Sequence, residues 1–238
     1  MKIAMIAALA GLAALTLNAS AATLGIGDPA PQIKASAWVK GSPVEKLDAG
    51  KTYVVEFWAT WCGPCRVSIP HLTEMAHKFK DKVTFVGMDV FERGDAEAVT
   101  TLVKKFVDDM GDKMDYNVAM DAKDKFMAEQ WMNAAGQNGI PCAFVVEKTG
   151  KIAWIGHPMG GLEKALEDIT AGKWDPEKAK KRADAQKQVE EFFQAAMKGE
   201  DAEQLAKKGK ELEALDKELG GIMPEEKFDA QKVIKQAR

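Results

Sequence analysis

Apolar runs typical of strands alternate with amphipathic segments typical of helices between residues 53 and 171. The predicted strands are "YVVEFWA" (53–59), "KVTFVGMDV" (82–90), "NVAMD" (117–121) and two strands within "GIPCAFVVEKTGKIAWIG" (139–156), which turn at Lys148-Thr149-Gly150. The predicted helices are 66–79, 96–110, about 123–134, and 162 to about 171. Their predicted buried faces are Val67, Leu72, Met75, Ala76 and Phe79 in the first, and Val99, Leu102, Val103 and Phe106 in the second.

The alternation of strands and helices along the chain favours an α/β sheet with helices on both faces that ends in an antiparallel hairpin. A Gly- and Pro-rich entry segment precedes it, with an edge strand near Ala35–Val39.

The pattern changes after Trp174, where Lys, Glu, Ala and Gln dominate and no strand is predicted. Two apolar stripes at helical spacing, separated at Gly199, indicate a helical hairpin, and a short helix follows Gly220-Gly221 and Pro224. The stripes are Val189, Phe192, Phe193, Ala196 and Met197, then Leu205, Leu212, Leu215 and Leu219. An amphipathic hairpin must bury its apolar face. We therefore expect it to cover part of the sheet domain, to form a dimer, or to dock a partner.

The first 22 residues are typical of a secretory signal peptide. A lysine precedes an apolar run from Ile3 to Leu17, and Ala19-Ser20-Ala21 then resembles a cleavage site. The run is shorter than the roughly 20 apolar residues of a membrane span, although an uncleaved anchor is the alternative. We expect cleavage near Ala21 and a secreted or periplasmic protein. The predicted domains are a signal peptide (1–22), an α/β domain (23–172) and a helical extension (173–238).

Composition and charge exclude some classes of partner. The chain has 238 residues, of which 46% are hydrophobic and 29% charged, and its formal net charge is -3. These values are typical of a soluble globular protein. There is no basic excess to bind phosphates, so nucleic acid is not an expected partner.

Two of the three cysteines lie close together in "WCGPC", as Cys62 and Cys65, and Cys142 stands apart. A structural zinc site needs four ligands, usually including a second closely spaced pair, and the chain has none. A disulfide here would close a very short loop and would constrain the unfolded chain little. Redox exchange fits better, so we expect no metal and no cofactor.

The predicted helix start supplies what redox exchange needs. Cys62 would occupy the N-cap, where free amides and the helix dipole stabilise a thiolate, the form that attacks disulfides. Cys65 would lie one turn further on, shielded but close enough to resolve a mixed disulfide. Pro64 suits the first turn, where no amide hydrogen is required.

The motif "FWATWCGPC", with Glu56 before it and "GIPCAFVVEKTGKI" after it, resembles the thioredoxin superfamily. More narrowly, it resembles the exported TlpA/ResA-like thiol-disulfide oxidoreductases. The resemblance covers about residues 27–171. It implies a thioredoxin-like fold with an inserted strand–helix element, here followed by a helical extension.

The resemblance also implies roles for particular residues. Cys62 matches the nucleophile, Cys65 the resolving thiol, and Pro141 the cis-proline beside the disulfide. Glu56 matches the buried acid beneath the cysteines. Burial should raise its pKa and suit it to accept the proton of Cys65, although a salt-bridged structural glutamate is the alternative. The residues expected to contact substrate are Trp61, Gly63, Pro64 and Ile140.

Two positions depart from the family pattern. Ser68 stands three residues after the second cysteine, where some relatives carry a glutamate. Cys142 directly follows the expected cis-proline, and we interpret it as an inert buried thiol rather than a third redox residue. The histidines at 71, 77 and 157 have no partner signature.

The predicted function is reduction of protein disulfides by the Cys62/Cys65 dithiol. The uncharged Gly-Pro spacer favours a potential nearer about -270 mV, as in thioredoxin, than about -120 mV, as in a strong oxidant. Such an enzyme needs an upstream dithiol donor, which the resemblance places in the membrane. The alternatives are a peroxidase of the related peroxiredoxin branch and a non-enzymatic assembly module that acts through the C-terminal helices.

Overall fold

The computed structural model describes residues 23–222 and 227–237, so the predicted signal peptide lies outside the described residues. Its centre is a six-stranded sheet in the order β1-β4-β3-β2-β5-β6. The strands are β1 (Ala35–Lys40), β2 (Thr52–Trp58), β3 (Val83–Asp89), β4 (Asn117–Asp121), β5 (Cys142–Val146) and β6 (Ile152–Gly156).

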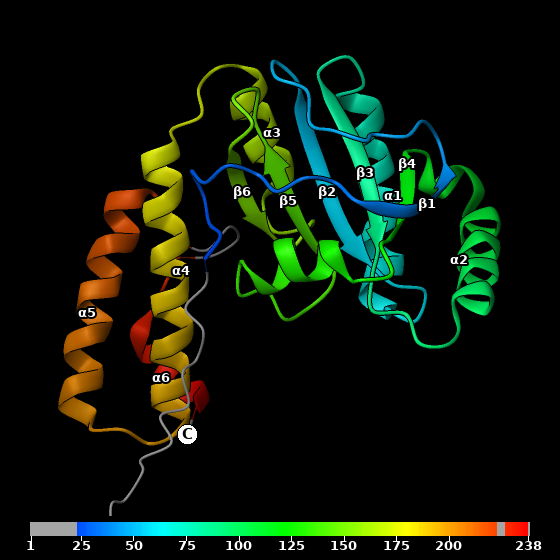
Figure 1. Cartoon of the computed structure of the whole chain (residues 1–238). Coiled ribbons are helices and arrows are strands. Elements are labelled where there is room, and N and C mark those ends of the chain that lie inside the picture. The colour runs from blue at the N-terminus through cyan, green and yellow to red at the C-terminus, as the bar shows by residue number, and fades with distance from the viewer. Residues whose placement is uncertain (1–22, 223–226, 238) are drawn as a thin grey trace, which may run out of the picture.

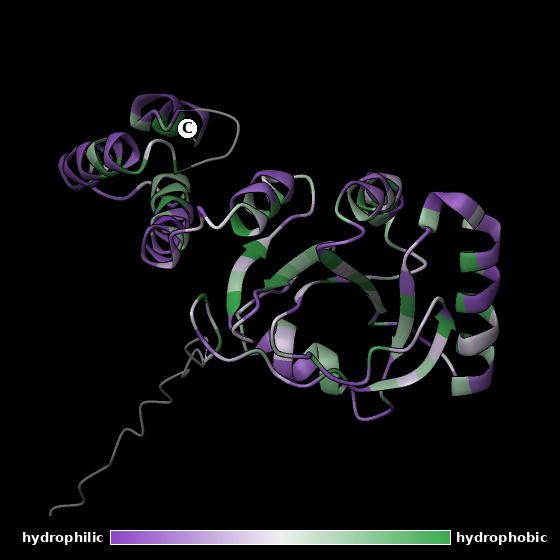
Figure 2. Cartoon of the chain, turned by 90° about the horizontal axis from the view of Figure 1, so that it is seen from above, coloured by the Kyte–Doolittle hydropathy of each residue, from purple (hydrophilic) through white to green (hydrophobic). Residues whose placement is uncertain are grey.

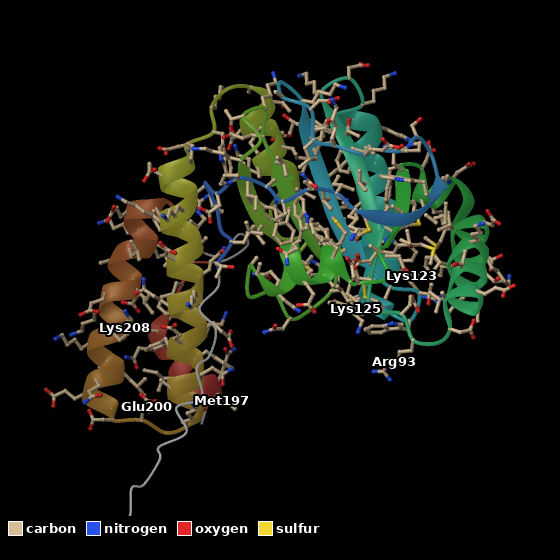
Figure 3. All side chains as sticks on the ribbon, viewed as in Figure 1. Arg93, Lys123, Lys125, Met197, Glu200 and Lys208 are labelled. Carbon is tan, nitrogen blue, oxygen red and sulfur yellow. A yellow bond between two sulfur atoms is a disulfide. The ribbon has the colours of Figure 1, made fainter. Side chains whose placement is uncertain are left out.

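Strand direction sets the position of the loops. The strands β2, β3 and β4 run parallel, so their carboxyl ends meet at one end of the sheet. In Figure 3 this end carries Arg93, from the loop after β3, and Lys125, from the loop after β4. The pairs β1–β4, β2–β5 and β5–β6 are antiparallel, and the last of these is the predicted hairpin.

Helices cover both faces of the sheet, as predicted. One face packs against α1 (Gly63–Lys78), α2 (Ala96–Met110) and α3 (Leu162–Thr170), and the other packs against the short π-helix η2 (Ala128–Asn133). Figure 2 shows α1 and α3 on one side of the sheet and η2 on the opposite side. Side chains of β2 alternate between two cores because a strand has a two-residue period: Val54 and Trp58 enter one core, and Val55 and Phe57 the other.

The prediction of a helix from Lys123 to Ala134 is wrong in extent and type, because the regular element is η2. The carboxylate of Asp121 accepts the amides of Ala122, Met127 and Ala128, and this forms a turn in place of the first helical turns. Lys125 has φ of 56°, which no helical residue adopts.

The predicted apolar faces of the first two helices also need correction. Val67 of α1 is 65% exposed and Leu102 of α2 is 47% exposed. The stripe that α2 buries is Val103, Phe106 and Val107. A short 3-10 helix, η1 (Gly111–Met114), follows α2.

The C-terminal segment forms three helices: α4 (Pro176–Met197), α5 (Ala202–Leu219) and α6 (Ala230–Ala237). Figure 1 shows them beside the sheet, next to β6. Their apolar stripes pack mainly on one another, around Phe192, Leu205 and Leu212. Met197 was predicted within this stripe, but it is exposed at the tip of α4. Within the described ranges, no helix combines the length and apolarity that crossing a membrane demands.

Candidate active site

A disulfide joins Cys62 and Cys65 at the turn between β2 and α1. Cys62 is the N-cap of α1, and its Sγ accepts the backbone amide of Cys65 at 3.1 Å. Cys62 is 3% exposed and Cys65 is fully buried. Cys62 is therefore the sulfur nearer the surface, and Cys65 lies beneath it.

The start of α1 favours negative charge on Cys62. Pro64 occupies the first turn, which contains no acidic residue. The amide of Cys65 and the positive end of the helix dipole both act on the Sγ of Cys62, and both stabilise a thiolate. Gly63 and Pro64 are exposed, so a partner can reach this turn.

The fold brings Ile140 and Pro141 to the disulfide, although they lie almost eighty positions along the chain. The Ile140–Pro141 peptide bond is cis. The carbonyl oxygen of Ile140 lies 3.7 Å from the Sγ of Cys62. Pro141 is buried, whereas Ile140 remains partly exposed at the entrance to β5.

Apolar side chains form the exposed rim of the disulfide. Trp61 is 57% exposed and Phe91 is 38% exposed. The indole Nε1 of Trp61 donates to the carbonyl oxygen of Phe91 at 3.2 Å, so the two residues are held together. Together they offer an apolar surface beside Cys62.

Arg66 stabilises the turn between β2 and α1. Its guanidinium donates to the carbonyl oxygen of Thr60 at 2.7 Å and lies 4.9 Å from the ring centroid of Phe106. The ring of Phe106 in turn packs 5.0 Å from that of Trp58, which is fully buried. Arg66 thus links the turn to α2 and the core.

Glu56 lies in β2 on the same sheet face as the disulfide, between Val54 and Trp58. It is 1% exposed, and neither of its carboxyl oxygens has a hydrogen-bond partner among the described residues. Burial raises its pKa to about 8. The salt-bridged alternative therefore does not hold in this structure.

The space over Gly87 shows which groups surround Glu56. Gly87 pairs with Glu56 across β2 and β3. A Cβ atom added at Gly87 would lie 2.9 Å from the ring of Tyr116, 3.2 Å from Nε1 of Trp58 and 3.5 Å from Oε2 of Glu56. These three side chains converge on one buried point.

Cys142 lies on the opposite face from the disulfide, in the core formed with Phe57 and Phe144. It is 3% exposed, and burial raises its thiol pKa to about 12. A thiol that is buried and protonated does not exchange, which supports its interpretation as an inert residue.

Ser68 is also buried, and its hydroxyl donates to the carbonyl oxygen of Cys65 at 3.1 Å. It therefore supports the first turn of α1 and supplies no acid. Within the described part of the chain, no three His, Cys, Asp or Glu side chains come together in a way that could hold a metal ion.

Sequence reasoning missed two acids near the disulfide. Asp89 ends β3 and is 3% exposed, and Glu92 accepts the amide of Thr60 at 2.6 Å. The signal for Asp89 was present, because an acid within the apolar run "KVTFVGMDV" is as unusual as Glu56 in β2.

Comparison with known proteins agrees with this geometry. Residues 42–106 match the family model described as Thioredoxin. Protein FixW from Rhizobium leguminosarum is 32% identical over 160 residues, which is 65% of this chain and 70% of that protein. The thiol-disulfide oxidoreductase ResA from Bacillus thuringiensis is 31% identical over 128 residues, 53% of this chain and 66% of that protein. A solved thiol:disulfide interchange protein from Bacteroides sp. is 27% identical, with a TM-score of 0.49 over 63% of this chain and 92% of that chain.

A CxxC disulfide at the N-terminus of a helix, on a sheet with an antiparallel hairpin, defines a thioredoxin-fold oxidoreductase. The chain belongs to the thioredoxin superfamily and, within it, to the TlpA/ResA-like thiol-disulfide oxidoreductases.

Proposed function

We propose that this protein reduces protein disulfides in an exported compartment, with Cys62 as the nucleophile and Cys65 as the resolving thiol. The observation that carries the proposal is the position of Cys62. Its Sγ caps α1, accepts an amide and forms a disulfide with the buried Cys65.

The reaction consumes one dithiol for each substrate disulfide. The Cys62 thiolate attacks one substrate sulfur, a mixed disulfide forms and the other substrate sulfur leaves as a thiolate. Cys65 then attacks Sγ of Cys62, and the second substrate thiolate leaves. The substrate gains two electrons, and the protein returns to the disulfide seen here.

The exposed residues around the disulfide would bind the substrate. The exposed Trp61, with Gly63 and Pro64 beside it, offers contacts to an approaching chain. The backbone of Ile140, beside the cis Pro141, can pair with an extended substrate segment next to Cys62.

Glu56 serves as the proton carrier of this site. Because its pKa is about 8, both the acid and the carboxylate are accessible near neutral pH. The carboxylate takes the proton of Cys65 when that thiol attacks. In the reverse step, the acid returns a proton to the Cys65 thiolate when a donor opens the disulfide.

We further propose that residues 23–172 form the exchange unit and that 173–238 form an extension that docks a partner or a second copy. The signal-like residues 1–22 support export, and an upstream dithiol donor in the membrane would keep Cys62 and Cys65 reduced.

The reduction potential expected from the Gly-Pro spacer is about -270 mV. Equilibration with glutathione measures it, and a value above about -150 mV would contradict the reductive direction.

The test is to trap the mixed disulfide in cells. In Cys65→Ser, which lacks the resolving thiol, proteins attached to Cys62 should accumulate and be released by dithiothreitol. The matched control is Cys62→Ser, which keeps Cys65, and Cys142→Ala is added to both variants. If both variants capture the same proteins, or neither captures any, Cys62 is not the nucleophile of a protein disulfide reductase.

A further inference from the structure

Asp89 is a second buried acid close to the disulfide. It is the last residue of β3, where it pairs with Trp58 of β2, and it lies on the sheet face that carries Glu56. It is 3% exposed, and its Oδ1 has no hydrogen-bond partner among the described residues. No step of the proposed exchange reaction uses the Asp89 side chain.

Asp89 is coupled to the surface through Glu92. The carboxyl groups of Asp89 and Glu92 lie close together, and Glu92 is one of the acids that raise the pKa of Asp89. Two carboxyl groups can form a hydrogen bond only when a proton lies between them. Glu92 is partly exposed, and its Oε1 accepts the amide of Thr60 in the turn before Cys62.

Asp89 is also coupled to Glu56. Glu56 pairs with Gly87, and Asp89 lies two residues further along the same strand, on the same face. The charge of Glu56 acts on Asp89 and is one of the causes that raise its pKa. The Nε1 of Trp58 and the ring of Tyr116 lie over Gly87, next to Oε2 of Glu56.

The charged groups around Asp89 come from several elements. Glu56 of β2, Asp121 of β4 and Glu92 of the loop all act on it, and all three are acids. Burial and these acids raise the pKa of Asp89 to about 9. From α1, Arg66 donates to the carbonyl oxygen of Thr60.

We propose that Asp89 relays protons between the buried Glu56 and Glu92 at the surface. The inference rests on the proposed function. When a thiolate of a dithiol donor attacks Sγ of Cys62, a donor–Cys62 disulfide forms, the Cys62–Cys65 bond breaks and Cys65 leaves as a thiolate. The second donor thiol then releases Cys62, and the donor is oxidised to a disulfide. The Cys65 thiolate takes a proton from Glu56, Glu56 takes one from Asp89, and Asp89 takes one from Glu92, which exchanges with water. Asp89 touches no sulfur atom, so it is a positioning and relay residue that acts through Glu56.

The test measures the rate at which dithiothreitol reduces the oxidised full-length chain, by stopped-flow tryptophan fluorescence between about pH 6 and pH 10. The quantity compared is the ratio of the wild-type rate to the variant rate, since this ratio cancels the ionisation of the donor thiol. For Asp89→Asn we expect a ratio of about ten at neutral pH. It should fall toward one above about pH 9, where the wild-type Asp89 has lost its proton as well.

A double-mutant cycle separates a relay from mere support of the fold. If Asp89 acts through Glu56, then Asp89→Asn causes no further loss in a Glu56→Gln background. A structural defect would instead multiply with the Glu56 effect. The relay is overturned if the rate losses of Asp89→Asn and Glu56→Gln multiply in the double variant. It is also overturned if the ratio of wild-type to Asp89→Asn rates does not change with pH.

Glu92→Gln is the second variant, because glutamine still accepts the Thr60 amide but passes no proton. We expect it to slow reduction as Asp89→Asn does, and it decides the question alone if Asp89→Asn fails to fold. The matched control, Asp81→Asn, changes an exposed acid at the opposite end of β3 and should have no effect. If Cys65→Ser traps proteins while the Glu92→Gln and Asp89→Asn ratios stay at one, the relay is wrong and the reductase stands. A wild-type protein that dithiothreitol does not reduce overturns both.

Discussion

Glu56 is a buried ionisable group whose carboxyl oxygens have no hydrogen-bond partner among the described residues. Its pKa is raised from 4.5 to about 8, so between these values the folded protein binds a proton there that the unfolded chain has released. The free energy of unfolding therefore falls as pH rises through this range. The full loss is reached above pH 8, and it is on the order of 4 to 5 kcal/mol.

Glu56→Gln removes this dependence. We expect the variant to match the wild-type stability near pH 5 and to exceed it near pH 9, as measured by urea unfolding of the oxidised protein. The matched control is Glu45→Gln, which changes an exposed glutamate and should follow the wild type. Equal losses of stability in wild type and Glu56→Gln would show that Glu56 ionises freely in the fold.

Cys142 should be chemically silent in the folded protein. Its thiol is buried and its pKa is raised to about 12, so almost no thiolate exists near pH 8. We expect iodoacetamide to leave the oxidised native protein unlabelled and to label one cysteine after unfolding in urea. Labelling of Cys142 in the native state, detected by peptide mass spectrometry, would contradict its inert role.

The sequence predicts a residue of the site when its role depends on neighbours along the chain, and misses it when its role depends on contacts between distant segments. Cys62 and Pro64 were predicted because their roles depend on the neighbouring helix start, and Glu56 because an acid in an apolar strand is a local signal. The Asp89–Glu92 pair depends on the register of β2 against β3 and on the loop that returns Glu92 to Thr60. No local pattern encodes that contact.

At the scale of elements, β2 and β3 can support the site because Gly87 makes room for it. A Cβ atom at this position would lie 2.9 Å from the ring of Tyr116 and 3.2 Å from Nε1 of Trp58. Both side chains are buried and cannot move freely. The glycine thus allows large polar side chains to gather over the middle of the sheet.

Gly87→Ala should therefore destabilise the protein by about 1 to 3 kcal/mol through overpacking. The measurement is urea unfolding at neutral pH. Gly139→Ala is the control, since a Cβ atom there meets nothing within 4 Å. An unchanged midpoint in Gly87→Ala would mean that Tyr116 and Trp58 rearrange without cost.

The strands and long helices followed from periodicity, whereas the segment after β4 did not. Its apolar residues do recur at helical spacing, but the carboxylate of Asp121 caps three amides and replaces the expected first turns. Val67 also fits a helical pattern but is exposed, because the face that α1 buries is formed by other residues, among them Ile69 and Leu72. A helical pattern shows which residues could be buried, but neighbouring elements decide which residues are.

At the scale of the whole molecule, the C-terminal helices have their own core and a loose junction with the sheet. A cavity of about 430 Å³ lies between α3, α4 and β6, lined by Trp154, Trp174 and Arg182 among others. Within the helical unit, Gly209 of α5 allows close approach of α6, because a Cβ atom there would lie 2.5 Å from Cβ of Ala230. The two parts should therefore unfold separately.

Gly209→Ala tests this independence. Five of the six tryptophans lie in the sheet domain, at or before position 154, and Trp174 lies at its junction with α4. Tryptophan fluorescence therefore reports mainly the sheet domain, whereas far-ultraviolet circular dichroism reports both parts. We expect the variant to lose helical signal at lower urea concentrations, while the tryptophan transition and the rate of disulfide exchange stay at wild-type values. Lys210→Ala, at an exposed neighbouring position, serves as the control. If fluorescence and circular dichroism shift together in Gly209→Ala, the helices and the sheet unfold as one cooperative unit, and the extension is part of the domain that carries the disulfide.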